Sequence, residues 1–474
     1  MFKRAAASGL RRLLLAHARR VPAARAQARS AERAMGIARW AAGCSPAYRQ
    51  LLHEHGLTPS RLASPCELKQ LPVLSKAATF GRFALSELAR PVDARNLADV
   101  LTSSGRSGGH FGFRLTERQE HDRAWFGIDL GLADAFRVDA LSTLLINCLP
   151  MGVVFGSRAV TVANVSVRAD MACAIARDIG PRFQQTLLCT DPLFVRRLLD
   201  EGRTARVDWA ALNTSVIVGE ECLVEAQRDH IAHELGMNPD REPHRLVGST
   251  FGVGELGLNL LFETRETVRI RRAARNVPAL FALLTGGLGP GAMPTVFCYS
   301  PHRLCAEVID PDEHGFGELC LTLLSRQAVI PLPRFATGDV ARLLGPAELA
   351  LAAGLAGVAK PWLPVVLVSG RRGDRCGIGP TVEDVKELIY ADSFDANLLS
   401  GAFRIELDTQ GMGAIVVQAA AASTAAAGAC QARLAFRAAK LRWEARIVVV
   451  APEDFFGRPL LDYERKFPYR AKPA

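Results

Sequence analysis

The sequence predicts an α/β fold in which a large domain of several parts is followed by a small α+β domain. Short apolar runs that indicate buried strands alternate with helical patterns, for example at residues 144–149, 186–189, 215–218 and 295–299. Such alternation is typical of a mostly parallel sheet with covering helices. The chain has 474 residues, more than one hydrophobic core usually supports, which favours more than one domain.

The last part of the chain has a pattern of its own. Apolar residues 365–369 run into the polar, glycine-rich stretch 370–374, which is typical of a junction between domains. Beyond it we expect helices at 382–389 and 431–440 and strands at 403–407, 414–418 and 445–450. The predicted division is a basic N-terminal arm at 1–40, a large domain at 41–370 and a small domain at 371–474.

The net charge of +10 is concentrated at the N-terminus. Residues 1–40 carry ten Lys or Arg against one acid, Glu32, whereas the rest of the chain holds 48 basic and 47 acidic residues. A nearly neutral body argues against a nucleic-acid partner. Three interpretations of the arm stay open: a solvated helix, an amphipathic helix that contacts a membrane surface or a partner, and an organelle-import presequence.

Membrane, secretory and metal signals are weak throughout the sequence. A membrane-spanning helix needs about 20 strongly apolar residues, and no stretch supplies them. The short apolar run near the N-terminus contains Arg11, Arg12 and Arg19, which excludes a secretory signal. The eleven cysteines include no Cys-x-x-Cys pair, so we expect no disulfide framework and no zinc site, but reduced thiols in a cytoplasmic protein.

The most informative stretch is Ser-Ser-Gly-Arg-Ser-Gly-Gly-His at residues 103–110. Small hydroxyl residues and glycines let consecutive backbone N–H groups approach a phosphate and form an anion-binding nest. By itself the stretch is a weak signal, and a Ser/Gly-rich surface loop is the simpler interpretation. It is no P-loop of the Gly-x4-Gly-Lys type, because no lysine follows the glycines.

In its context, the stretch at 103–116 resembles the phosphate loop of adenylate-forming enzymes, and most closely their phenylacetate–CoA ligase-like branch. The resemblance extends over nearly the whole chain. Residues 45–57 and 68–76 are similar to the family's N-terminal helix and the segment leading to the first subdomain, and 218–220 is similar to its central Gly-Glu step. The resemblance implies a large adenylation domain and a small mobile C-terminal domain.

Two further motifs in the same order resemble nucleotide-binding segments of that family. Residues 251–257 are similar to its aromatic-Gly-x-Thr-Glu-x-Gly motif, which implies that Phe251 and Gly252 contact adenine and that Glu255 is a catalytic residue and holds Mg²⁺. Residues 334–339 are similar to its Arg-Tyr-x-Thr-Gly-Asp motif, which implies that Asp339 binds the ribose hydroxyls. Taken singly, Glu255 is equally a helix-start acid and Thr-Gly-Asp an ordinary turn.

The C-terminal part carries the last two matches. The Gly370–Arg371 step resembles the hinge about which the family's small domain rotates, and Arg371 is expected beside the ribose. Lys466 stands where the family has its catalytic C-terminal lysine, which would offset charge at the α-phosphate during adenylation. A solvated lysine in a basic tail is the alternative interpretation.

Three positions depart from the family pattern. Arg106 replaces a hydroxyl residue of the phosphate loop and Phe111 its second lysine, while Gly254 replaces a threonine. Thr250, just upstream, offers a hydroxyl in place of the last. An arginine in the loop can bind phosphate through two N–H groups, so the changes are compatible with activity. The phosphate-binding residues predicted are Ser103, Ser104, Gly105, Arg106, Ser107, Gly108 and Thr250.

The resemblance implies an ATP-dependent ligase that converts a carboxylic acid to an acyl-AMP and passes the acyl group to a thiol, most simply that of coenzyme A. ATP, Mg²⁺ and coenzyme A are the cofactors and co-substrates it implies, and a homodimer is compatible with it. Three other functions stay open: acyl transfer to a carrier-protein thiol, a nucleotide-binding scaffold without turnover, and an anionic-surface binder acting through residues 1–40.

Overall fold

The structure is a computed structural model that describes residues 2–470 except 63–64, 104–109, 240, 243, 288–292, 373–378, 408–412, 421–425 and 456–460. The chain divides into two compact units. The first unit comprises residues 1–135, 250–289 and 296–371, and the second comprises residues 136–249, 290–295 and 372–474. The predicted α/β fold with a separate small C-terminal sheet is confirmed.

The first unit is built from strands and helices that come from both ends of its sequence. Its helices are α1 (Phe2–Arg20), α2 (Ala23–Cys44), α3 (Pro46–Glu54), α4 (Leu85–Leu88), α5 (Arg118–Phe136), α9 (Arg265–Ala274), α10 (Pro278–Thr285) and α11 (Pro346–Ala356). Its strands are β1 (Leu97–Thr102), β2 (Phe113–Glu117), β8 (Gly257–Phe262), β9 (Thr295–Tyr299), β10 (Leu304–Ile309), β11 (Gly317–Leu323), β12 (Phe335–Leu343) and β13 (Val365–Arg371).

The sheet of the first unit is largely antiparallel, which corrects the expectation of mostly parallel strands. Its order is β10-β11-β12-β13-β9-β8, and the pairs β10–β11, β11–β12, β12–β13 and β8–β9 are antiparallel. Short connections such as 310–316 between β10 and β11 allow only a hairpin, whereas a parallel pair needs a long crossover. Strands β1 and β2 form a separate antiparallel hairpin.

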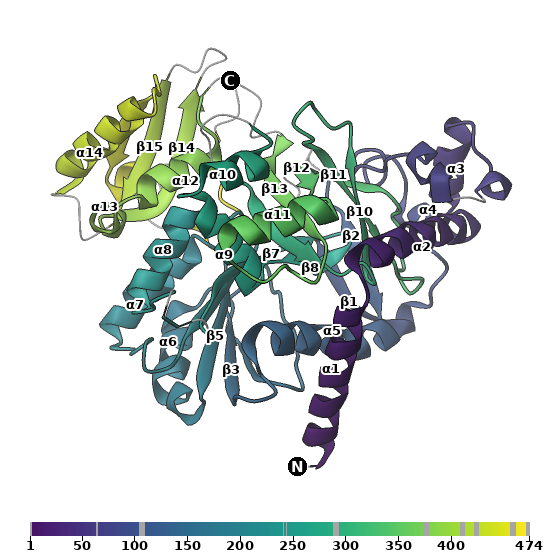
Figure 1. Cartoon of the computed structure of the whole chain (residues 1–474), viewed down its shortest axis with the longest axis horizontal. Helices are drawn as coiled ribbons and strands as arrows, with labels where there is room; N and C mark the ends of the chain where they lie inside the picture. The colour runs from purple at the N-terminus through teal and green to yellow at the C-terminus, as the bar shows by residue number, and fades with distance from the viewer. Residues whose placement is uncertain are drawn as a thin grey trace. The chain divides into compact units, whose positions relative to one another are not determined.

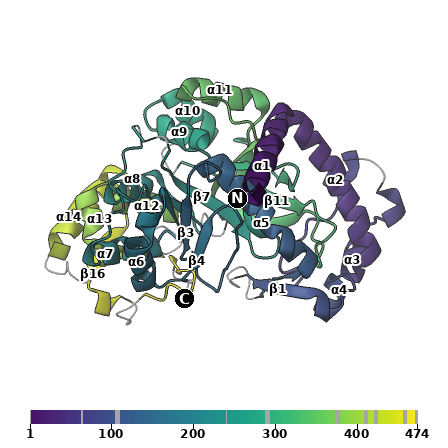
Figure 2. The same cartoon turned by 90° about the horizontal axis from the view of Figure 1, so that it is seen from below.

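The core of the first unit joins the N-terminal helices to this sheet. Ala34, Ala38 and Ala41 on one face of α2 are fully buried and belong to the same apolar cluster as Leu319 and Leu321 of β11. Helix α1 packs on α5, because Arg11 is buried beside Asp129 at 3.7 Å and Arg19 donates to Asp134 at 2.6 Å. Helices α9, α10 and α11 form a group of their own (Figure 2).

The second unit contains the parallel strands that the sequence predicts. Its strands β3 (Thr143–Asn147), β4 (Thr161–Asn164), β5 (Gln185–Thr190) and β6 (Ser215–Val218) are ordered β4-β3-β5-β6 with every pair parallel. Helices α6 (Ala169–Asp178), α7 (Phe194–Thr204) and α8 (Glu225–Glu234) cover them (Figure 1) and share their apolar cluster. Strand β7 (Val247–Val253) pairs in parallel with β6 through residues 247–249 and antiparallel with β8 through residues 250–253.

The C-terminal part of the second unit has its own sheet and core, and is called the small domain here, from Pro380 onward. Strands β14 (Leu399–Leu407), β15 (Gly413–Ala419) and β16 (Arg446–Val450) form its sheet, with helices α12 (Val382–Tyr390), α13 (Ser393–Asn397) and α14 (Ala427–Lys440). Thr381 and Asp384 form a capping box that starts α12, whose buried face carries Val385, Leu388 and Ile389.

Among the residues described, no helix combines the length and apolarity needed to span a bilayer.

Candidate active site

The residues at the base of the predicted phosphate loop form a closed hydrogen-bonded clamp in the first unit. The Ser103 amide donates to the Gly112 carbonyl at 3.0 Å, and the Gly112 amide donates to Ser103 Oγ at 2.9 Å. Lys76 donates to the same Oγ at 2.9 Å. The hairpin β1–β2 supports this clamp from both sides, because Ser103 directly follows β1 and Gly112 directly precedes β2.

Glu255 reaches the same clamp from the turn between β7 and β8. Its Oε1 lies 2.9 Å from the Lys76 Nζ, and its side chain is only 2% exposed. A Cβ at Gly112 would lie 2.1 Å from Oε1, and a Cβ at Gly254 would lie 3.0 Å from Ser103 Cα. Gly112 and Gly254 therefore let three chain segments meet closely. Gly254 departs from the family pattern, and the close approach of Ser103 gives a steric reason for a residue without a side chain there.

Lys76 is fixed by a short bridge to the strand that carries Asp339. The Leu74 amide donates to the Arg334 carbonyl at 2.9 Å, and the Ala336 amide donates to the Leu74 carbonyl at 2.7 Å. This bridge pairs Leu74 with Phe335, which lies four residues before Asp339 on β12. Along the strand, Phe335 and Asp339 are therefore within about 13 Å of each other. The segment that leads to Lys76 is thus hydrogen-bonded to the strand that carries Asp339, the predicted ribose-binding carboxylate.

Asp339 and Arg371 are neighbours across β12 and β13. They are partners in the strand register, with Arg371 Nε 3.9 Å from Asp339 Oδ1. Asp339 is 6% exposed, and Gly338 before it has a φ of +79°, a conformation that suits glycine. The structure therefore brings these two predicted residues together at the end of the strand pair.

A second cluster of charged groups lies in the second unit, where the parallel strands β5 and β6 end. Lys466 Nζ lies 2.9 Å from Glu220 Oε2, and its side chain is 17% exposed. Glu220 has a φ of +70°, which is unusual for a residue with a side chain and often marks a functional position. A pocket there is lined by Pro150, Asp191, Leu193, Glu220, Glu221, Tyr463, Arg465, Lys466 and Phe467.

Asp191 adds a titrating carboxyl to this pocket. It directly follows β5, and its Oδ1 accepts from the amides of Leu193 and Phe194 at 2.8 and 3.0 Å. Burial raises the pKa of Asp191 to about 7; the Phe194 amide opposes this rise, while Glu221 and Glu220 add to it. Carboxyl ends of parallel strands are where α/β proteins place ligands, so the pocket is a candidate site on topology as well.

The geometry can be compared with solved structures. No protein-family model matches the chain, and no curated protein matches its sequence. A 2-hydroxyisobutyryl-CoA ligase in the postadenylation state, in complex with 2-HIB-AMP, matches with a TM-score of 0.66 at 14% identity over 96% of this chain and 90% of that one. The same ligase in an open conformation with 2-HIB-AMP and CoA matches with a TM-score of 0.54 at 15% identity over 96% of this chain and 93% of that one.

The chain has the adenylate-forming fold. The resemblance inferred from the sequence motifs is confirmed at the level of this fold. Membership of the phenylacetate–CoA ligase-like branch stays a prediction, as do the roles of the individual residues.

Within the adenylate-forming fold, the predicted residues are distributed unevenly. Ser103 and Glu255 meet at Lys76, and Asp339 meets Arg371. Lys466 belongs to the second unit and pairs there with Glu220. The remaining loop residues predicted to bind phosphate, Ser104, Gly105, Arg106, Ser107 and Gly108, lie outside the described residues.

The predicted residues on β7 point to alternate faces of the strand. Phe251 packs against the core, with its ring 6.3 Å from that of Phe297, and is partly buried. Thr250 is partly exposed and is the register partner of Phe262, which lines a pocket of the first unit together with Thr264 and Trp362. Gly252 is exposed. Contact of Phe251 and Gly252 with adenine remains a prediction.

The geometry at Glu255 does not fit a bound magnesium ion while Lys76 stays in place. A +2 ion on this carboxylate would lie next to an ammonium that is 2.9 Å from its Oε1, inside a side-chain environment closed to solvent. The described part of the chain holds no cluster of three or more His, Cys, Asp or Glu arranged for a metal. Magnesium binding by Glu255 stays a prediction, and no step proposed below depends on it.

Three residues of the candidate site are absent from the sequence-based site prediction. Lys76 ends the quoted stretch 68–76, but nothing local links it to Ser103 or Glu255, which are distant in sequence. Glu220 and Asp191 each come two residues after the end of a predicted buried strand, 215–218 and 186–189 respectively. Polar residues at the ends of parallel strands are the signal that points to both.

Proposed function

We propose that the chain is an ATP-dependent acid–thiol ligase. In the first step a carboxylate oxygen attacks the α-phosphorus of ATP, the new P–O bond forms, and pyrophosphate leaves. In the second step a thiolate attacks the acyl carbon of the acyl-AMP, the thioester forms, and AMP leaves with the oxygen of the broken bond. The fold supports this class, and the residues of the two clusters support the individual roles.

The observation that carries the proposal is the convergence of Lys76, Ser103 and Glu255 at the base of the loop. Ser103 Oγ accepts from Lys76 and Gly112, so its own proton is directed to a third acceptor such as a phosphate oxygen. The phosphate loop lacks a lysine at Phe111, which is exposed. Lys76 supplies an ammonium to this loop from a different segment, which favours an active enzyme over a scaffold without turnover.

The second unit supplies the other charge that the chemistry needs. In the proposed first step, Lys466 stabilises negative charge that develops between the α-phosphate and the attacking carboxylate. In the structure its ammonium is paired with Glu220, so we expect it to exchange this carboxylate for the anionic substrates. Asp339, with Arg371 beside it, is proposed to accept from the ribose hydroxyls.

Coenzyme A is the proposed thiol, as in the ligase whose structure in complex with 2-HIB-AMP and CoA shares the fold. A pyrophosphate-release screen of aromatic and aliphatic acids, with and without coenzyme A, tests the function. We expect release that needs both ATP and one class of acid, and thioester only when coenzyme A is present. Release without thioester, restored by a carrier protein, would move the acceptor to a protein thiol; no acid-dependent release from any acid would refute the proposal.

A further inference from the structure

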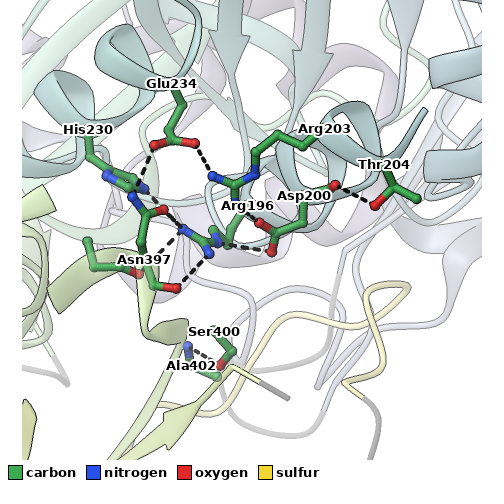
Figure 3. Close-up of polar contacts among 10 residues, drawn as sticks. Arg196, Asp200, Arg203, Thr204, His230, Glu234, Asn397, Ser400 and Ala402 are labelled. Atoms are coloured by element: carbon green, nitrogen blue, oxygen red, sulfur yellow. Dashed lines mark hydrogen bonds and ion pairs between the residues drawn. The ribbon is translucent and has the colours of Figure 1, made fainter. Parts of the chain in front are cut away.

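Two helix ends at the seam between the small domain and helices α7 and α8 are capped by side chains from the opposite side of the seam. Arg196 of α7 donates to the carbonyl oxygens of Ala396 and Asn397, which end α13. Figure 3 shows Arg196 against Asn397. Glu387 of α12 accepts from the amides of Glu225 and Ala226, which begin α8. Each part of the second unit thus bonds to terminal backbone groups of a helix in the other part.

Arg196 is held in one orientation by groups on both sides of the seam. It is 5% exposed, its Nε donates to Asp200 at 3.1 Å, and its guanidinium donates to Asn397 Oδ1 at 2.6 Å and to the Asn397 carbonyl at 3.1 Å. A planar guanidinium suits this arrangement because its donors point in fixed directions. A positive charge at the carboxyl end of a helix is also favoured by the helix dipole.

The groups around Arg196 continue the contact across the seam. The Asn397 side chain donates to Glu234 Oε1 at 3.2 Å, and Arg203 donates to the other oxygen of Glu234 at 2.7 Å (Figure 3). His230 lies 3.4 Å from the guanidinium, and burial together with Arg196 lowers the pKa of His230 to about 4. A neutral imidazole therefore accepts there without adding a second positive charge.

In the Glu387 contact the side chain is the acceptor and the backbone amides are the donors, whereas in the Arg196 contact the side chain donates to backbone carbonyls. Its two oxygens accept at 2.9 and 3.1 Å from successive amides at the start of α8, where the helix dipole favours a negative charge. The preceding residue, Lys386, is buried and pairs with Glu221 at 2.8 Å. Glu221 directly follows Glu220, the partner of Lys466.

We propose that the Arg196–Asn397 and Glu387–α8 contacts, called the docking contacts here, hold the small domain on α7 and α8 as one body. In this docked arrangement they position Lys466 at Glu220. Arg196 is then a positioning residue, because it acts on Lys466 through the small domain and touches no reacting atom. The consequence for catalysis rests on the proposed function, whereas the docking itself does not.

Amide hydrogen exchange tests the docking without any substrate. If the contacts hold one body, Arg196→Ala at one end releases the other end as well. We expect the exchange of the Glu225 and Ala226 amides to become about tenfold faster, since opening free energies set exchange rates. The matched control is Arg197→Ala, because Arg197 is an exposed neighbour on α7 whose ion pair with Glu201 lies within the same helix.

The reciprocal variant keeps the test independent of local damage. Glu387→Gln preserves the size of the side chain and removes its charge, and we expect it to speed the exchange of the Leu398 amide, which donates to Asp395 at the end of α13. Faster exchange confined to the helix end next to each substitution, with an unchanged opposite end, would overturn the proposal. If Arg196→Ala does not fold, Arg196→Lys and Glu387→Gln carry the same cross-comparison.

A kinetic measurement then tests the link to Lys466. In the active ligase, Arg196→Ala should lower kcat for pyrophosphate release by about tenfold and leave KM for ATP unchanged, because uniform substrate binding is not altered. Arg196→Lys should restore part of the loss. Altered exchange with normal pyrophosphate release would sink the positioning role alone, and an enzyme without acid-dependent release would count against the proposed function while leaving the docking result valid.

Discussion

The Lys76–Glu255 pair of the first unit and the Lys466–Glu220 pair of the second have the same separation, 2.9 Å, in different surroundings. Glu255 is 2% exposed and walled by the backbone of Gly112, whereas Glu220 is 13% exposed and lines a pocket. The Lys76–Glu255 pair closes a junction of three segments within the first unit. The Lys466–Glu220 pair depends on Lys466, which the small domain carries.

This difference separates two kinds of contribution from an ion pair. A fully enclosed carboxylate needs its partner for stability, because an unpaired charge in that setting is costly. The Lys466–Glu220 pair is less enclosed and borders a pocket, so its lysine is better placed to exchange partners. We therefore expect substitution of Lys76 to lower stability more than substitution of Lys466 does, although both substitutions should lower activity.

The largest effect is expected for Lys466→Ala. Pyrophosphate release should fall by about 10³-fold, comparable to removal of one preorganised electrostatic contact to a transition state. The free energy of unfolding should fall by less than in Lys76→Ala, because Glu220 is less enclosed than Glu255. Lys440→Ala, an exposed lysine at the end of α14, is the control. A variant with normal release would show that Lys466 takes no part in the adenylation step.

The same substitution at Lys76 should lower stability as well as pyrophosphate release, because Lys76 pairs with the buried Glu255 and also contacts Ser103 at the base of the phosphate loop. Lys76→Ala leaves the Glu255 carboxylate buried without its ammonium, and we expect a loss of about 3 kcal/mol in urea unfolding. Adding Glu255→Gln should recover part of that loss, because it removes the unpaired charge. Equal stability of the single and double variants would contradict the enclosed ion pair.

Crowding at Gly112 tests the junction without changing a charge. In Gly112→Ala the new Cβ would lie 2.1 Å from Glu255 Oε1, so the clamp at Ser103 must shift. A displacement of about 1 Å at a reacting site costs about 10²-fold in rate. We expect a loss of that order in pyrophosphate release. Gly127→Ala on α5, where a Cβ meets nothing within 4 Å, should leave the rate unchanged. Loss of activity in both variants would point to a general effect on folding.

The smallest effect is a pH dependence in the second unit. Burial raises the pKa of Asp191 to about 7, so between pH 4 and 7 the folded chain binds a proton that the unfolded chain has released. The stabilisation from this proton is lost as the pH rises towards 7. Asp191→Asn keeps the acceptor for Leu193 and Phe194 and removes the titration.

We expect Asp191→Asn to gain on the order of 2 kcal/mol over the wild type between pH 5 and pH 8, because each tenfold change in proton affinity is worth about 1.4 kcal/mol. Urea midpoints at the two pH values measure this difference. A constant gap between variant and wild type would mean that Asp191 titrates normally.

Local patterns placed the strands and helices for which the sequence predicts a range, which are about half of the strands and a minority of the helices in the described structure. The predicted strand at 215–218 coincides with β6, and the predicted helix at 382–389 ends one residue before α12 does. These elements follow from apolar runs and capping residues, which act over short distances. The antiparallel pairing in the first unit was missed, because the register between distant strands is set by tertiary contacts.

The site was predictable only where a motif is contiguous. Asp339 and Arg371 meet because adjacent strands carry them, and Glu255 lies in a short turn between paired strands. Lys76 escaped prediction since its contact with Ser103 spans 27 residues and depends on the bridge from Leu74 to β12. Arg196 likewise contacts Asn397 across 201 residues, which no local pattern reveals.

The fate of the carboxylate oxygen tests the central claim most directly. With an accepted acid labelled with oxygen-18 in its carboxylate, and with ATP and coenzyme A, mass spectrometry of the released nucleotide follows the broken bond. An acyl-AMP route predicts AMP that carries one labelled oxygen, because that oxygen remains on phosphorus when the thiol takes the acyl group. Unlabelled AMP, or ADP together with labelled phosphate, would contradict adenylation by this chain.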